Sequence, residues 1–286
     1  MGRFEGRRVI VTGASRGIGA GIAERFAAEG ASVVVTARTL DPIEELAGSL
    51  GETVERCAQY GSTVVPLVAD LANADDRARI VPESEELLGG PIDVLVNNAA
   101  AGIHRLAAEL SLKHRRIMFE VNFHAPIDLA QAAIPSMRDR GAGWIINVTS
   151  ASSDLTAGPP PFPWSAMGTT QGAYGSSKAA LNRYTNILGV ELYGTGVRVN
   201  ALQPVKPVAS EGAVAHLQGR IPADQFNPVE VMAEAALALG SCAPELTARV
   251  VDDGPLLAEL GMPVRTMDGS AVMEGLTGGA FTYTGE

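Results

Sequence analysis

The feature that most limits the possible folds is a series of short apolar runs rich in valine and isoleucine. Residues 8–12 (RVIVT) and 92–97 (IDVLVN) are two of them, and they are apolar almost throughout, with no alternation between apolar and polar residues. Such runs are typical of strands that are buried on both faces of a sheet. The other runs are residues 32–36, 62–69, 144–150, 197–203 and 248–252.

Segments with helical periodicity separate these runs. Ile18, Ile22 and Phe26 are spaced four apart on one helical face, and Gly30 follows as a stop signal. The alternation of strand and helix predicts an α/β fold, namely a Rossmann-like, doubly wound parallel sheet of about seven strands with helices on both faces. The other segments predicted to be helical are residues 112–137, 174–194 and 227–240.

The chain of 286 residues contains no linker-like stretch, so we expect one domain over residues 1–286, with a tail at 261–286 for which no fold is predicted. Its net charge of −10 is opposite in sign to that of a nucleic-acid-binding surface, so nucleic acid is not an expected partner.

No apolar run is long enough to cross a bilayer and no signal peptide is visible, so we expect a cytoplasmic protein without membrane attachment. Cys57 and Cys242 form no CxxC pair and are expected to be buried as small apolar residues.

Three glycines, Gly13, Gly17 and Gly19, follow the first predicted strand in the sequence VIVTGASRGIG. Glycine lets the backbone turn sharply and approach a pyrophosphate, and the N terminus of the next helix supplies N–H groups and a partial positive charge. Because this turn lies between a buried strand and an amphipathic helix, it predicts a dinucleotide site, with an ordinary tight turn as the alternative.

The spacing TGxxxGIG, together with NNAA at residues 97–100, Asn122, Ser150 and Tyr174-x-x-x-Lys178, resembles the short-chain dehydrogenase/reductase family. The resemblance covers roughly residues 6 to 255, with the motifs in the same order, and implies an enzyme with a nicotinamide cofactor. The residues expected to bind the cofactor are Gly13, Ser15, Arg16, Gly17, Ile18, Gly19, Arg38, Asp70, Asn98, Tyr174, Lys178, Pro204 and Val205.

The end of the second predicted strand indicates which nucleotide is bound. Enzymes that use NAD place an acidic residue there to bind the ribose 2′-hydroxyl, but this chain has Ala37 followed by Arg38. With Arg16 in the glycine turn, two guanidinium groups suit a 2′-phosphate, which predicts NADP(H); the alternative is that both arginines are solvated surface residues. Asp70 matches the family residue that contacts adenine, although a turn or helix-capping aspartate is nearly as good an interpretation.

Tyr174 and Lys178 are four residues apart and therefore lie one turn apart on one helix face. The ordinary pKa of tyrosine is about 10, and a nearby cation favours the phenolate. We therefore expect this pair to provide general acid–base catalysis. Ser150 ends the preceding strand, where sheets of this kind bind ligands, and the resemblance implies that it orients the substrate oxygen for Tyr174. Thr149 and Ser152 are the hydroxyl residues most easily confused with it.

By the same resemblance, Asn122 completes the catalytic set, and its main-chain carbonyl holds a water that passes protons to the lysine. A helical carbonyl normally accepts from the N–H four residues on, which here is Pro126 and has none. The carbonyl is then left available for a water; the alternative is that Pro126 only kinks or starts a helix. The four histidines have no metal-ligand spacing, so no metal is predicted.

The segment between Ser150 and Tyr174 is longer than in most relatives, and four prolines bias its middle to a stiff, extended path. Phe162, Trp164 and Met167 give it apolar surface, so we predict a wall of the substrate site, with a contact between subunits as the alternative.

The chain departs from the family pattern beside the expected nicotinamide position. Ala100 and Val205 replace common glycines, and Ala209 and Ser210 stand where a threonine often contacts the cofactor. The acid–base residues are all present. We therefore expect an NADP(H)-dependent carbonyl reductase or alcohol dehydrogenase that acts on a hydrophobic small molecule and forms a homo-oligomer, either a tetramer or a dimer. The alternatives are a non-catalytic NADP-binding regulator or scaffold and an enoyl reductase.

Overall fold

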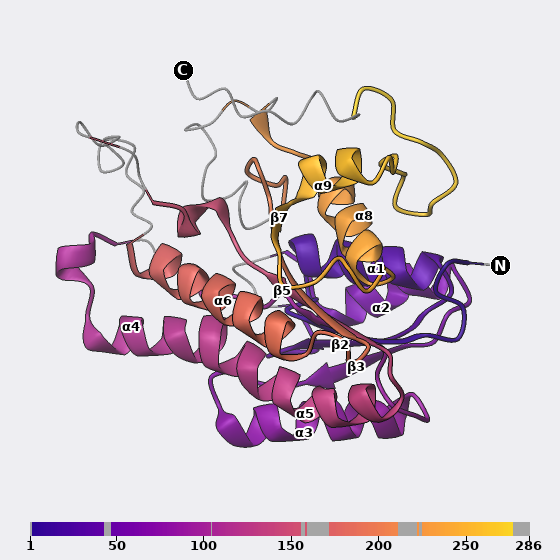
Figure 1. Cartoon of the computed structure of the whole chain (residues 1–286), viewed down its shortest axis with the longest axis horizontal. Coiled ribbons are helices and arrows are strands. Elements are labelled where there is room, and N and C mark those ends of the chain that lie inside the picture. The colour runs from indigo at the N-terminus through magenta and orange to yellow at the C-terminus, as the bar shows by residue number, and fades with distance from the viewer. Residues whose placement is uncertain are drawn as a thin grey trace.

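The computed structural model describes residues 2–42, 47–103, 105–155, 158, 172–210, 222 and 225–276. Its centre is one parallel sheet in the order β3-β2-β1-β4-β5-β6-β7, which confirms the predicted doubly wound fold (Figure 1). The strand order reverses between β1 and β4, and ligands bind at such a switch point beyond the carboxyl ends of the strands. The strands are β1 Arg8–Thr12, β2 Ser32–Ala37, β3 Val64–Val68, β4 Val94–Asn97, β5 Gly143–Val148, β6 Val197–Gln203 and β7 Val250–Asp252.

Helices cover both faces of the sheet, with α1, α2 and α8 on one face and α3, α5 and α6 on the other (Figure 1). The α-helices are α1 Gly17–Ala28, α2 Leu50–Ala58, α3 Ala74–Leu87, α4 Leu112–Phe119, α5 Ala125–Asp139, α6 Gly172–Glu191, α8 Val229–Leu239 and α9 Asp253–Glu259. Shorter helical turns are η1 Ala107–Glu109, η2 Glu120–His124 and η3 Ala151–Ser153. None of the helices in the described part of the chain is long and apolar enough to cross a membrane.

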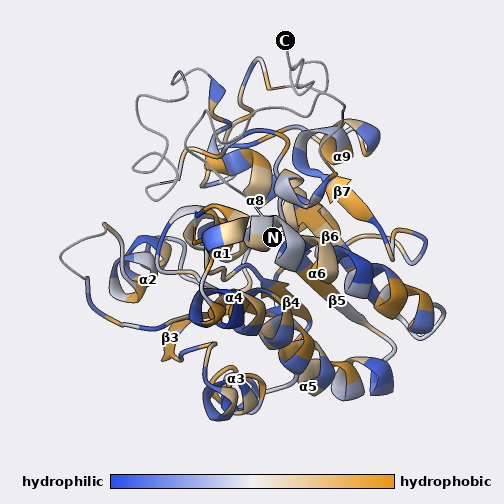
Figure 2. Ribbon diagram, turned by 90° about the vertical axis from the view of Figure 1, so that its left-hand side faces the viewer, coloured by the Kyte–Doolittle hydropathy of each residue, from blue (hydrophilic) through white to orange (hydrophobic). Residues whose placement is uncertain are grey.

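The strands are buried on both sides, as their unbroken apolar runs predict. In β1, Val9 and Val11 belong to the core beneath α1 and α8, whereas Ile10 belongs to the core beneath α3, α5 and α6. The alternation follows from the two-residue period of a strand, and it fills both layers at once. Figure 2 shows hydrophobic colour along the strands and a mixture of colours on the surrounding helices.

Helix α1 has the predicted apolar face, since Ile22 and Phe26 are fully buried and Ile18 packs against the same core. Gly30 has a φ of 90°, which only glycine adopts readily, and its N–H donates to the carbonyl of Ala27 at 3.0 Å. The chain can therefore reverse directly into β2.

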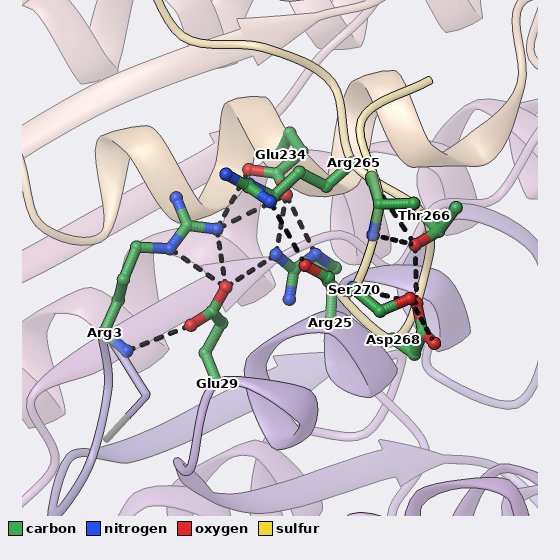
Figure 3. A network of polar contacts seen from close by, with 10 residues as sticks. Arg3, Arg25, Glu29, Glu234, Arg265, Thr266, Asp268 and Ser270 are labelled. Carbon is green, nitrogen blue, oxygen red and sulfur yellow. Dashed lines mark hydrogen bonds and ion pairs between the residues drawn. The ribbon is translucent and has the colours of Figure 1, made fainter. Parts of the chain in front are cut away.

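The described part of the C-terminal tail packs against α1 and α8, where it covers a buried ion network (Figure 3). Arg25 of α1 is fully buried; its Nη2 donates to Glu29 at 2.6 Å and its Nε donates to Glu234 of α8 at 2.9 Å. Arg3 donates to both carboxylates at 3.0 Å. Gly269 lies against the Arg25 guanidinium, because a Cβ at that glycine would be 2.9 Å from Nη2.

Candidate active site

The predicted site residues gather along the carboxyl edge of the sheet. Gly13 follows β1, Asn98 follows β4, Ser150 follows β5 and Pro204 follows β6. Because all these strands are parallel, their carboxyl ends meet at one edge, with the N terminus of α1 opening onto it.

The glycine turn has the backbone geometry that its sequence predicts. Gly13 and Gly17 have φ values of 66° and 55°, a left-handed conformation that side chains disfavour. Gly19 is required by packing, since a Cβ there would clash with the Asn98 side chain and the Gly13 carbonyl. The turn can therefore bring its backbone close to a bound phosphate.

Asn98, predicted to contact the cofactor, supports this turn from β4. Its Nδ2 donates to the carbonyl of Thr12 at 2.9 Å and to that of Gly13 at 3.2 Å. In return, the Thr12 hydroxyl accepts from the N–H groups of Asn98 and Ala99 at 3.0 and 3.1 Å. Thr12 was missed as a site residue in the sequence, although it stands at the start of the TGxxxGIG pattern.

At the nucleotide end, Arg38 is exposed and Arg16 is partly buried. Arg16 donates through Nη2 to the carbonyl of Gly48 at 3.4 Å, while its buried Nη1 has no hydrogen-bond partner among the described residues. An unpaired guanidinium nitrogen fits a phosphate group. Asp70 forms a turn, in which its Oδ1 accepts from the N–H of Ala72 at 3.0 Å, and this geometry agrees with the alternative interpretation of that residue.

Ser150 lies at the base of η3 and hydrogen-bonds the side chain of Tyr174. Its Oγ also accepts from the N–H of Ser152 at 3.2 Å and lies 3.0 Å from the Ser152 hydroxyl. Ser152 thus orients Ser150. The Thr149 hydroxyl is buried without a partner in the part of the chain that the structure describes.

Lys178 is almost completely buried, with its ammonium 5.9 Å from the centre of the Tyr174 ring. Its Nζ donates to the carbonyl of Val148, at the end of β5, at 2.8 Å. Burial lowers the pKa of Lys178 to about 8.

The expected acidification of Tyr174 is not what the structure shows. Burial raises the pKa of Tyr174 above its ordinary value, and the hydrogen bond with Ser150 offsets this only in part. The cause is the desolvation of Tyr174, and the Lys178 ammonium donates to a main-chain carbonyl. Tyr174 is therefore protonated at neutral pH and is ready to donate.

Asn122 is fully buried and ties two parts of the site together. Its amide forms a pair of hydrogen bonds with the main chain of Ala101, at 2.7 and 3.0 Å, and its Nδ2 also donates to Ser177 at 3.0 Å. Ser177 donates in turn to the main-chain carbonyl of Tyr174 at 2.7 Å. Ser177 and its role were missed in the sequence, since a helical serine carries no signal of its own.

The segment around Asn122 is helical but not uniformly α-helical. Residues Glu120–His124 form a π-helical turn, and the N–H of Ala125 donates to the carbonyl of Glu120, five residues back. Pro126 supplies no N–H to Asn122, which is the condition that the proton-relay hypothesis requires. The predicted helix 112–137 is thus divided into α4 and α5 by this wider turn.

At the turn after β6, which is predicted to contact the cofactor, Val205 is held by a residue that the sequence analysis did not single out. The N–H of Val205 donates to Oδ1 of Asp253, at the start of α9, at 3.1 Å. Phe162, Trp164 and Met167, the predicted substrate wall, lie outside the described residues.

Comparison with models of known protein families shows to which family the chain belongs. A model of the short chain dehydrogenases matches residues 7–211. The chain belongs to the short-chain dehydrogenase/reductase family. Members of this family are oxidoreductases that act with nicotinamide cofactors.

Two curated relatives and one solved structure show the extent of the likeness. A short chain dehydrogenase of Pseudocercospora fijiensis is 36% identical over 74% of this chain, which spans 63% of that relative's length. L-xylulose reductase of Bos taurus is 32% identical over 90% of this chain and 98% of its own. A 3-oxoacyl-(acyl-carrier-protein) reductase of Agrobacterium tumefaciens with NADP bound matches with a TM-score of 0.71 and 27% identity, over 87% and 93% of the two chains.

Proposed function

We propose that this short-chain dehydrogenase/reductase is an NADP(H)-dependent carbonyl reductase or alcohol dehydrogenase that acts on a hydrophobic small molecule. The observation that carries the proposal is the hydrogen bond between Ser150 and Tyr174, with Lys178 buried one helical turn away. These are the groups needed to hold a carbonyl oxygen and to give it a proton.

The chemistry follows from the protonation states of the site. When bound, the nicotinamide supplies a hydride to the carbonyl carbon or accepts one from the alcohol. Ser150 holds the substrate oxygen by a hydrogen bond, and the Tyr174 hydroxyl, protonated at neutral pH, donates its proton to that oxygen. Lys178 lies beside the tyrosine with its ammonium held by the main-chain carbonyl of Val148. Asn122 fixes the loop after β4 against α6 through Ala101 and Ser177.

The residues that would hold the cofactor are the glycine turn with its Asn98 support, Lys178 and the main chain at Pro204 and Val205. Arg16 and Arg38 would hold the 2′-phosphate, because one nitrogen of Arg16 is buried without a partner among the described residues and Arg38, which immediately follows β2, is exposed. The likeness to a reductase with NADP bound supports the same choice.

The direct test is to follow NADPH oxidation over a panel of ketones and aldehydes of increasing size. We expect turnover that favours the larger apolar carbonyls, together with NADPH binding in the absence of substrate. NADPH binding without turnover of any carbonyl or alcohol would identify a non-catalytic regulator instead.

Replacing Arg38 by aspartate is expected to raise the KM for NADPH by at least about tenfold and to allow use of NADH, because a charge-assisted hydrogen bond to the 2′-phosphate becomes a repulsion. Arg249→Asp is the matched control, since Arg249 immediately precedes β7 at the amino edge of the sheet and pairs with Glu259 on the surface. Steady-state kinetics with both cofactors make the comparison. Equal efficiency of the unmodified protein with NADH and NADPH would contradict the assignment.

We also expect a homotetramer or homodimer. The outer side of α6 and the turn after it expose large apolar side chains, with Ile187, Val190 and Tyr193 being 37%, 56% and 65% exposed. Light scattering at micromolar concentration should give a multiple of 29.7 kDa, and Val190→Glu should shift the mass downwards. A monomeric mass for the unmodified protein would rule out this assembly.

A further inference from the structure

A buried carboxylate, Asp253, lies where β7 ends and α9 begins. The residue is completely buried, and no basic side chain is within ion-pair distance among the described residues. Burying a carboxyl group without a cation is costly, so such a residue needs polar partners to remain in place. Burial raises the pKa of Asp253 to about 6, and the nearby Asp252 carboxylate acts in the same direction.

The partners of this carboxylate are main-chain N–H groups. Its Oδ1 accepts from the N–H of Gly254 at 2.8 Å and from that of Val205 at 3.1 Å. The first bond is local, whereas the second joins α9 to the turn after β6, 48 residues earlier in the chain. Oδ2 is buried and has no partner in the described part of the chain. Only Oδ1 therefore anchors the turn.

The turn at residues 204–207 has few main-chain N–H groups by which it can be held in position. Pro204 and Pro207 have no N–H, so Val205 and Lys206 are the only residues of 204–207 that can donate from the main chain. Beyond the turn, the segment is fixed by Asn227, whose N–H donates to Pro207 at 2.8 Å and whose carbonyl accepts from Ala209 at 2.9 Å. The bond from Val205 to Asp253 ties the first half of the turn to the start of α9.

We propose that Asp253 is a positioning residue of the cofactor site, which fixes the main chain at Val205 so that the turn after β6 can receive the nicotinamide end of the dinucleotide. The inference rests on the proposed function, because it takes the Pro204–Val205 turn as a cofactor contact. An anchored main chain also fixes where the Val205 side chain lies.

The test compares Asp253→Ala with Asp253→Asn. Asparagine keeps an oxygen that can accept from Val205, and alanine does not. We expect Asp253→Ala to raise the KM for NADPH about tenfold while kcat and the KM for the carbonyl change less than about twofold, and we expect Asp253→Asn to restore the KM to within about threefold. Asp252→Ala is the matched control. This substitution removes a carboxylate that accepts from Gln203 at 2.9 Å, and it leaves the bond from Val205 to Asp253 in place.

A second measurement needs no cofactor. Amide hydrogen exchange of a peptide covering residues 203–210 should be faster in Asp253→Ala than in the unmodified protein, and close to normal in Asp253→Asn. Unchanged exchange in the alanine variant, or equal KM defects in the alanine and asparagine variants, would overturn the inference. Absence of NADPH binding by the unmodified protein would instead refute the proposed function, while the exchange measurement still decides whether Asp253 holds Val205.

Discussion

Tyr174→Phe is expected to lower kcat for carbonyl reduction by about 10²–10⁴-fold, because the only atom removed is the oxygen that carries the proton. NADPH affinity should change less than about twofold, since the ring and Lys178 remain. The hydroxyl also contributes a hydrogen bond with Ser150, whose loss costs about 1–3 kcal/mol in stability and leaves the protein folded, so it cannot account for the loss of turnover. Steady-state kinetics and a direct NADPH titration on the same preparation separate the two effects.

Tyr184→Phe is the matched control, because it makes the same chemical change on the same helix, α6, where the Tyr184 side chain bonds Gln131. We expect its kcat to stay within about twofold of the unmodified protein. If Tyr174→Phe retains more than a few per cent of the activity, or if both variants lose activity alike, Tyr174 is not the acid–base residue.

Glu234→Gln is expected to lower the free energy of unfolding by about 3–5 kcal/mol. Glu234 is 1% exposed and is paired with the fully buried Arg25, so neutralising it leaves the Arg25 guanidinium with Glu29 as its only acidic partner among the described residues. It also removes the carboxylate to which Arg3 donates (Figure 3). Urea unfolding at pH 7 and one fixed protein concentration measures the loss.

Glu259→Gln makes the same change at a surface pair, since Glu259 and its partner Arg249 are 50% and 42% exposed. Solvent screens this pair, so we expect a loss of only about 0–1 kcal/mol. Similar losses in Glu234→Gln and Glu259→Gln would show that the buried network contributes no more than a surface ion pair.

The sequence was sufficient to predict most of the sheet. The strand at residues 8–12 was predicted to the residue, and that at 62–69 was predicted too long by two residues at its start and one at its end. Apolar runs locate buried strands well because both faces must be filled, whereas the residue at which pairing stops depends on the neighbouring strand. No helix was singled out in residues 74–87, where Pro82 interrupts the helical pattern; Pro82 lies on the exposed side of α3 and is accommodated there.

Part of the site could also be predicted from the sequence, because the glycine turn, the helix positions and the strand ends depend on local spacing and chain order. The glycine turn must open α1, and residues four apart on α6 must share a face. Parallel strands then bring Ser150 and the turn at Pro204 to the same edge. These conclusions need only the period of each element and the direction of each strand.

The tertiary structure alone decided which polar groups meet inside the molecule. It placed Asn98 beneath the glycine turn, and it joined Asn122 to Ala101 and to Ser177. It put Asp253 behind Val205, and it buried Tyr174 enough to raise its pKa where a neighbouring lysine was expected to lower it. Each outcome depends on contacts between segments far apart in the chain and on how completely water is excluded around them, and neither quantity is contained in a local sequence pattern.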